Sequence, residues 1–394
     1  MSKDKPKKLL VIGATSFVGR RFCRNLIERE YHSQLSITFS ARNENKFKEL
    51  FPDSSLPKSI NFSKLDTYDS KDVHELVSKH NIVCNFAGPF SKYGKNVVEA
   101  CAKYGVHYLD ITGEINFIKE MIIKHEDTAK TSGASLIPFC GFDSVPSDLG
   151  VFLIKEKINK LHSSPLKSAH IIYRVKGGIN GGTIASAFEA ISDIPNEEIS
   201  NLHYLCPNER TFFPPLEGNK RKNLKGINVG PFFMEQINNK IVYRTKHLRE
   251  HQGYAKNFLY QESMFISDNF SFLTSRILQI SLDLTDALLK VKKLSKILRL
   301  ALPKPGEGPS DDLIENGFFK AQVIGISETG ETESITISAD GDPGNKATVN
   351  LILLCLDSLL KTENPPSGFQ TPMSCFGDKI IKNSQHFNIH IKDN

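Results

Sequence analysis

The sequence predicts an α/β protein in which a doubly wound parallel sheet is followed by a second α+β domain. Two observations predict it: short apolar runs alternate with helical patterns over the first 140 residues, and a glycine turn follows the first run. The runs are apolar without strict alternation, as in parallel strands covered on both faces. We therefore expect a Rossmann-type domain at the N-terminus, in which ligands bind at the carboxyl ends of the strands.

The elements of this first domain follow in order. Six runs are expected to be strands: "KLLVIG", "LSITFS", "SINFS", "NIVCNFAG", "VHYLDI" and "ASLIPF". Helical spacing begins near Phe17, Asn43, Asp69, Gly94, Asn116 and Glu126. The alternation ends near residue 145, where we place the first domain boundary.

A different pattern follows. The runs "SAHIIYRVKGGI" and "NKIVYRTKHL" predict longer, half-exposed strands, and "FFKAQVIGISETGETESITISAD" predicts a hairpin that turns at Thr329 and Gly330. A short helix is expected from Thr183. The run "ATVNLILLCLDSLLK" is apolar enough to predict a buried helix that returns to the first domain. The predicted domains are 1–145, 146–345 and a C-terminal helix and tail over 346–394.

Composition limits the function classes. The net charge is +6, but 44 acidic residues are interleaved with 50 basic ones, so we expect no nucleic acid as a partner. The first apolar run is too short for a secretory signal, which favours an intracellular, cytoplasmic protein. The seven cysteines are scattered without a C-x-x-C pair and are expected to be reduced core thiols.

The turn "GATSFVG" carries the clearest chemical signal. Gly13 ends the strand, Gly19 allows the helix to pack closely, and the helix N-terminus offers backbone N–H groups to a phosphate. Ser16 occupies the place of a second glycine, where its Cβ crowds a ligand and its hydroxyl can donate to a phosphate oxygen. The remaining predicted phosphate-binding residues are Thr15, Phe17 and Val18.

The ends of the next strands indicate which dinucleotide binds. After the second strand the chain has Ser40, Arg42 and Asn43 in place of the acidic residue that binds a ribose hydroxyl, and arginine suits a 2′-phosphate. The sequence therefore predicts NADP(H) as cofactor, unless Arg42 is only a solvated residue. Sheet topology further places Asp66 beside the adenine. It places Ala87, Gly88, Pro89 and Tyr93 beside the nicotinamide.

Several stretches together resemble the saccharopine dehydrogenase-like oxidoreductase family, which includes the mycobacterial trans-acting enoyl reductases. They are "VIGATSFVGR", "NFAGPFSKYGKNVVEACAKYGVHYLDITGE", "PFCGFDSVPSDLG", "GGTIAS", "PKPGEGPS", "GFFKAQVIG" and "ADGDPGNKAT". The family's first motif normally has glycine where this chain has Ser16. The resemblance implies a Rossmann domain, a second domain that covers the cofactor, and hydride chemistry on NADP(H). It leaves the substrate open between amino-acid derivatives and double bonds in lipid-like chains.

Hydride transfer also needs a group that donates a proton or polarises the acceptor. The predicted catalytic residues are Tyr93, as proton donor, together with Asp143 and Glu114, which follow predicted strands. The alternative for Asp143, and equally for Asp110, is a helix cap.

Two further features of the sequence bear on function. In "HLREH", His247 and His251 flank Glu250 in the order of an inverted zinc-protease motif, but the preceding run predicts a strand, so we expect no metal site. Residues 271–302 combine an apolar stripe with five basic residues between Lys290 and Arg299. This stretch is either an ordinary packed helix or one that lies on a membrane or lipid droplet.

The sequence as a whole favours an NADPH-dependent oxidoreductase that reduces C=C or C=N in a lipid-like or acyl-chain substrate. The alternatives are saccharopine or amino-acid dehydrogenase chemistry, for which Arg174 and Arg244 are the candidate carboxylate-binding residues, and a non-catalytic protein attached to lipid. The expected partner is a small-molecule or lipid-like substrate. Peripheral membrane or lipid-droplet contact through 271–302 and a homodimer are further hypotheses.

Overall fold

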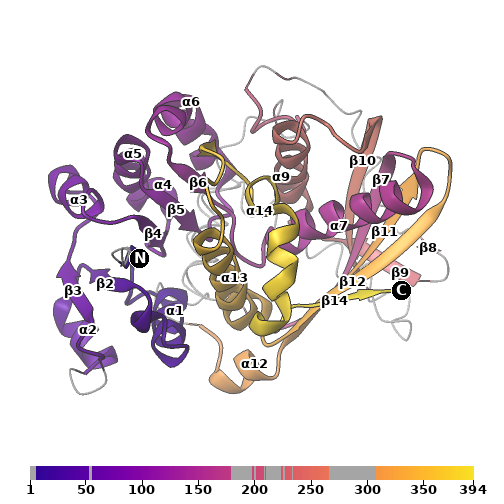
Figure 1. The fold of residues 1–394 in the computed structure, drawn as a ribbon. Helices are drawn as coiled ribbons and strands as arrows, with labels where there is room; N and C mark the ends of the chain where they lie inside the picture. The colour runs from indigo at the N-terminus through magenta and orange to yellow at the C-terminus, as the bar shows by residue number, and fades with distance from the viewer. Residues whose placement is uncertain are drawn as a thin grey trace, which may run out of the picture.

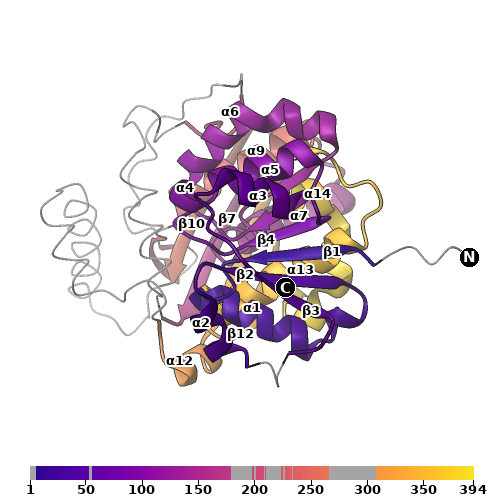
Figure 2. The same cartoon turned by 90° about the vertical axis from the view of Figure 1, so that its left-hand side faces the viewer.

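The computed structural model describes residues 6–52, 56–178, 198, 201–207, 209, 223–224, 227–232, 234–265 and 308–394. Over these residues the chain forms two seven-stranded sheets with helices packed on and between them (Figures 1 and 2). The predicted helices from Thr183 and over 271–302 lie outside the described residues, and so does Thr183 itself.

The first sheet is entirely parallel, in the order β13-β6-β5-β4-β1-β2-β3. Its strands are β1 (Lys8–Ile12), β2 (Ser36–Ala41), β3 (Ile60–Lys64), β4 (Ile82–Asn85), β5 (His107–Asp110), β6 (Ser135–Ile137) and β13 (Gly368–Phe369). Strand order reverses between β1 and β4, as in a doubly wound sheet. All six predicted strands are present, and the predicted fold class is confirmed.

Helices cover both faces of this sheet, which explains why its strands lack polar alternation. In β1, Leu9 and Val11 face one core cluster, while Leu10 and Ile12 face another. The helices are α1 (Phe17–Glu28), α2 (Glu44–Leu50), α3 (Ser70–Val77), α4 (Phe90–Tyr93), α5 (Lys95–Tyr104), α6 (Ile115–Ser132) and α7 (Val145–His162). The helical patterns near Asn116 and Glu126 belong to the single helix α6.

The second sheet is mixed, in the order β14-β12-β11-β7-β10-β9-β8. Its strands are β7 (Leu166–Lys176), β8 (Asn223–Leu224), β9 (Ile227–Pro231), β10 (Tyr254–Phe265), β11 (Phe318–Ser327), β12 (Thr332–Asp340) and β14 (His390–Asp393). Strands β7 and β10 are parallel, and the other pairs are antiparallel. The predicted hairpin is β11–β12, and Gly330 in its turn has a φ of +103°.

One predicted strand is wrong. The run "NKIVYRTKHL" lies in a helix, α9 (Glu235–Leu248). Its β-branched and aromatic residues predicted a strand, but burial on two sides decides the conformation. Ile241 packs into the core cluster around α5 and α6, whereas Val242 and Tyr243 pack into the other cluster.

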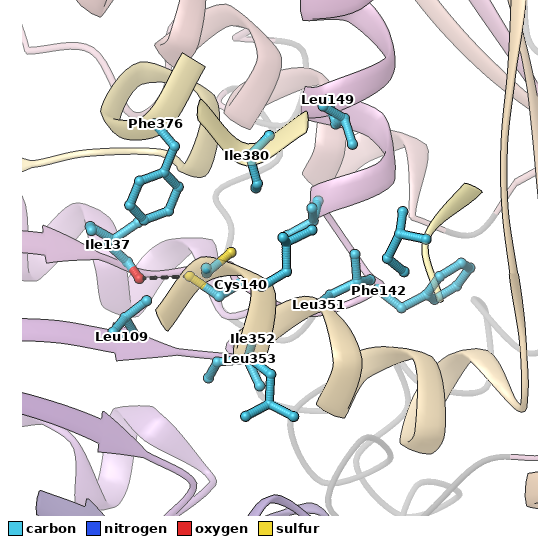
Figure 3. Packing of buried hydrophobic residues seen from close by; sticks show 14 of the residues in the cluster. Leu109, Ile137, Cys140, Phe142, Leu149, Leu351, Ile352, Leu353, Phe376 and Ile380 are labelled. Atoms are coloured by element: carbon cyan, nitrogen blue, oxygen red, sulfur yellow. Dashed lines mark hydrogen bonds between the residues drawn. The ribbon is translucent and has the colours of Figure 1, made fainter. Parts of the chain in front are cut away.

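The C-terminal segment connects the two sheets. It contains α13 (Thr348–Leu360), β13, α14 (Pro372–Phe376) and β14, so it adds one strand to each sheet. Figure 1 shows α13 between the sheets, and Figure 3 shows Leu351, Ile352 and Leu353 of this helix packed among Leu109, Leu149 and Phe376. In the same core the Cys140 thiol lies 3.2 Å from the Ile137 carbonyl oxygen (Figure 3). The remaining short elements are 3₁₀ helices at Tyr31–Ser33 and Gly377–Phe387, α12 (Asp311–Glu315) and a π-helical turn at Pro343–Ala347.

All seven cysteines are buried and free, as predicted. In the described part of the chain, every helix is too short or too polar to cross a bilayer.

Candidate functional site

The glycine turn lies where β1 ends and α1 begins. Gly13 has a φ of +78°, and a Cβ there would come within 2.7 Å of the backbone of Phe86 and Ala87 after β4. Gly19 packs so closely on the Gly13 carbonyl oxygen that a Cβ would overlap it. Both glycines therefore hold the turn in a shape that a larger residue would disrupt.

Three backbone amides of this turn remain available. Among the described residues, Thr15, Phe17 and Val18 have no hydrogen-bond acceptor for their N–H groups. The other amides are used: Gly13 and Ala14 donate to the Ser40 carbonyl oxygen. Open N–H groups at a helix N-terminus form an anion-binding site, so the turn fits the pyrophosphate of a dinucleotide.

Ser16 is the N-cap of α1. Its hydroxyl oxygen accepts from the Gly19 N–H at 3.0 Å. A hydroxyl that accepts one hydrogen bond still has its proton to donate. The side chain therefore takes the Gly19 amide away from a phosphate while it keeps an O–H that can replace it.

Basic side chains and a loop of the second domain border the same turn. The guanidinium groups of Arg20 and Arg21 lie 4.7 and 4.2 Å from the Phe17 ring. Arg21 also forms an ion pair of 2.8 Å with Asp311. Gly308 packs so closely on the Phe17 ring that a Cβ would overlap it. The chain at Gly308 and Asp311 therefore lies against the start of α1.

Arg42 follows β2 and is exposed. Its guanidinium carbon lies 5.0 Å from the Tyr93 ring centre, and the Tyr68 ring lies edge-on to Tyr93 at 5.1 Å. Asn43 is occupied as the N-cap of α2, where it accepts from Lys46 N–H at 3.0 Å. The Ser40 side chain is fully buried, and its hydroxyl has no partner among the described residues. Arg42 is thus the charged group that this strand end offers to a ligand.

The other predicted cofactor residues lie at the same edge of the sheet. Asp66 is exposed after β3 and accepts from the Tyr68 N–H. Ala87 donates its N–H to Asn85 Oδ1 at 3.0 Å, and Gly88 donates to the Phe86 carbonyl oxygen. Pro89 precedes α4. These residues follow β3 and β4 on either side of β1, so the strand order brings them around the turn.

Glu114, predicted to be catalytic, contacts the start of α4. It is 2% exposed, and its two carboxylate oxygens accept from Phe90 N–H and Ser91 N–H at 2.8 and 2.9 Å. These are the first amides of α4, so Glu114 caps that helix from a distant part of the chain. Asp110 accepts from Thr112 N–H, Phe139 N–H and the Tyr108 hydroxyl. Burial raises the pKa of Asp110 to about 7.

Asp143 lies in the loop between β6 and α7, after the carboxyl end of a strand. In the described chain its carboxylate has no hydrogen-bond partner, and burial raises its pKa to about 6. The neighbouring Ser144 hydroxyl is buried and also lacks a described partner. Neither side chain caps α7. Asp143 therefore retains a carboxyl group that titrates near neutrality.

Sequence reasoning missed a buried polar cluster in the second domain. Glu262 of β10 is fully buried and accepts from Ser147, Tyr260 and Asn238. The hydroxyls of Ser147 and Tyr173 lie 2.7 Å apart. Burial raises the pKa of Glu262 to about 7. The available signal was its position, because Glu262 falls on the same inward face of the strand as Phe258 and Tyr260.

Comparisons with known proteins agree with this geometry. The family model of the saccharopine dehydrogenase NADP-binding domain matches residues 9–137. A putative trans-acting enoyl reductase of Mycobacterium tuberculosis is 27% identical over 400 residues, which covers 95% of this chain and 94% of the relative. A trans-acting enoyl reductase of Mycobacterium ulcerans is 26% identical over 411 residues, and covers 96% of each chain.

Solved structures show the same fold. A saccharopine dehydrogenase of Saccharomyces cerevisiae aligns over 98% of this chain and 99% of its own, with a TM-score of 0.56 at 13% identity. A homospermidine synthase of Legionella pneumophila, in complex with NAD, aligns over 99% of this chain and 91% of its own, with a TM-score of 0.56 at 9% identity.

The family-model match and these relatives support an NADP-dependent oxidoreductase. The resemblance to the saccharopine dehydrogenase-like oxidoreductases is confirmed, and residues 9–137 are similar to the NADP-binding domain of that family.

Proposed function

We propose that the chain is an NADPH-dependent reductase that acts on an enoyl C=C bond, or on C=N, in a lipid-like or acyl-chain substrate. The assignment of NADPH as cofactor rests on the open backbone amides at Thr15, Phe17 and Val18, with Arg42 at the adjacent strand end. The mycobacterial enoyl reductases support the choice of an enoyl substrate, because their similarity to this protein extends along nearly the whole length of each sequence.

The preference for NADPH over NADH rests on the end of β2. A 2′-phosphate needs a cation, and Arg42 offers five N–H donors in a planar fork. Stacking on Tyr93 holds the guanidinium in place before a ligand arrives. Asn43 cannot replace this charge, because its side chain is a neutral amide whose oxygen already caps α2.

The reaction needs a proton as well as a hydride, and NADPH supplies the hydride when it is bound at the turn. We assign the proton-handling role to Asp143, whose carboxyl group combines a raised pKa near 6 with free hydrogen-bonding capacity in the described structure. Tyr93 is the second candidate, although its ring is engaged by Arg42 and Tyr68. Glu114 is assigned a positioning role, because it fixes the start of α4 beside Pro89.

Saccharopine or amino-acid dehydrogenase chemistry is less well supported, because the two candidate carboxylate-binding residues, Arg174 and Arg244, are engaged elsewhere. Arg244 is 2% exposed and donates to the carbonyl oxygens of Leu205 and Phe369, so it is unavailable to a substrate carboxylate. The Arg174 guanidinium stacks on the Phe265 ring at 3.6 Å. A dicarboxylate substrate would require a cluster of arginines, and these two are engaged separately.

The test is NADPH oxidation by the full-length protein, followed with short- and long-chain trans-2-enoyl thioesters and, separately, with 2-oxo acids paired with amines. Faster turnover of the long enoyl thioester supports the proposal. Turnover of the oxo acid and amine pairs alone would support amino-acid chemistry. NADPH binding without turnover of either set would support a non-catalytic protein.

A further inference from the structure

The structure brings together a set of metal-binding side chains that lies apart from the cofactor site. His247 lies at the end of α9, and His251 lies in the turn before β10. Glu209 comes from a separate part of the chain. Ligand atoms of Glu209, His247 and His251 lie within 4.8 Å of one another. The sequence predicts a strand before His247, and therefore no metal site, where the chain forms the helix α9.

The contacts converge on one carboxylate. Glu209 Oε1 lies 2.7 Å from His247 Nδ1 and 3.4 Å from His251 Nε2. Both imidazoles therefore approach the same oxygen, and their rings are nearly perpendicular. A cation bonded to these donors at about 2.0–2.2 Å would need only a small opening of the contact between Glu209 and His247.

A second observation points to a ligand at this place. His203 is 5% exposed, and its Nδ1 lies 2.7 Å from Glu209 Oε2. Despite this distance, Nδ1 makes no aligned hydrogen bond to any described residue. A buried ring nitrogen without a hydrogen bond is unfavourable. It is aimed at the carboxylate on which the other two imidazoles converge.

We propose that Glu209, His247 and His251 bind a divalent transition-metal ion of the Zn²⁺ type, beside the buried His203. Imidazole nitrogens with one carboxylate oxygen are a donor set that Zn²⁺ accepts in tetrahedral geometry. These three protein donors leave one tetrahedral position for water or a further ligand.

The position of the cluster indicates what the ion does. Residues 201–207 pack against the first domain, where the Tyr204 hydroxyl donates to Asn116 and Lys119 lies over the Tyr204 ring. His247 and His251 belong to the second domain. The ion would therefore join the segment that carries His203 and Glu209 to the end of α9, as a cross-link that stabilises the fold.

The test uses full-length protein treated with a chelator and titrated with Zn²⁺ alone, by calorimetry and by competition with a chromophoric chelator. We expect one equivalent to bind and the melting temperature to rise. His247→Gln and His251→Gln should each weaken binding by about 100-fold or more, beyond the range for groups that only support a ligand. His162→Gln is the matched control, because His162 contacts a single carboxylate, that of Glu333, at 2.8 Å.

Two results would overturn the proposal. One is Zn²⁺ binding by the wild-type protein that equals that of the His247→Gln and His251→Gln variants, and the other is a shift in melting temperature that the variants retain. Circular dichroism of the metal-free proteins controls for folding. Should one histidine variant fail to fold, Glu209→Gln replaces it, because this change keeps the side-chain shape and removes the charge.

Discussion

The guanidinium of Arg42 stacks on the ring of Tyr93, with 5.0 Å between Cζ and the ring centre. This contact joins the end of β2 to α4, two segments that flank the glycine turn in space. It places a positive charge at the strand end where doubly wound sheets generally bind the ribose of a dinucleotide.

Replacement of Arg42 by alanine should remove the preference for NADPH. The expected loss of NADPH affinity is about 1.5–3 kcal/mol, the usual contribution of a hydrogen bond to a charged group, and NADH affinity should not change. Fluorescence titration with both cofactors measures this difference. Arg24→Ala removes an exposed arginine from α1 and serves as the charge control. Equal affinities of the wild-type protein for the two cofactors would contradict the assignment.

Ser16→Gly should tighten NADPH binding weakly, because it removes a Cβ from the turn and releases the Gly19 N–H that Ser16 now accepts. Its stability cost should be a few tenths of a kcal/mol, since glycine is a tolerable N-cap, whereas Ser16→Ala should cost about 1 kcal/mol. Cofactor titration and urea unfolding of the two variants separate the effects. A tenfold loss of affinity in Ser16→Gly, about 1.4 kcal/mol, would show that the hydroxyl binds the phosphate.

Asp143→Asn should lower kcat by roughly 10²–10⁴-fold if the carboxyl group donates the proton, while the NADPH dissociation constant stays the same. Burial raises the pKa of Asp143 to about 6, so the protonated form should be lost as pH rises through this value. In the wild-type protein kcat should therefore decline above pH ~6. The Asp143→Asn variant should lack this decline. Tyr93→Phe is the comparison: if it reproduces the loss and Asp143→Asn does not, Tyr93 is the donor.

Glu262→Gln should flatten the pH dependence of folding stability. The folded-state pKa of Glu262 is raised to about 7 by burial, so between its unfolded value and pH ~7 the folded protein holds a proton that the unfolded chain releases. Stability from this group is present at low pH and is lost as pH rises toward 7. The difference in the free energy of unfolding between the variant and the wild type should change by up to about 3 kcal/mol across this pH window. Urea unfolding at acidic and alkaline pH measures it, and parallel pH profiles would refute it.

The stretch 271–302 is proposed to attach the protein to a lipid surface. Its five basic residues should each contribute roughly 1 kcal/mol near anionic lipid, so the full-length protein should sediment with anionic vesicles more than with neutral ones. Salt should weaken this binding. A variant with glutamine at Lys290, Lys292, Lys293 and Lys296 should remain in the supernatant. If the wild-type protein stays there at low salt, surface attachment is excluded.

The sequence by itself determined the parallel sheet and the glycine turn between β1 and α1. These features depend on local patterns: apolar runs that reach both faces of a strand, as in β1, and glycines whose spacing fixes the start of α1. The strand order then follows from the rules of doubly wound sheets. For this reason Gly13, Arg42 and Asp66 could be placed at one edge from the sequence alone.

Only the tertiary structure decided what the buried polar side chains do. The sequence predicts a catalytic role for Glu114, but it could not show that the oxygens of this side chain accept from amides more than 20 residues away. The run before His247 looked like a strand, yet packing on two sides makes it a helix and brings His247 to Glu209. The same physical reason applies to Glu114 and to the helix before His247. Long-range packing supplies the hydrogen-bond partners and the burial of a residue, and the neighbouring residues in the sequence do not show them.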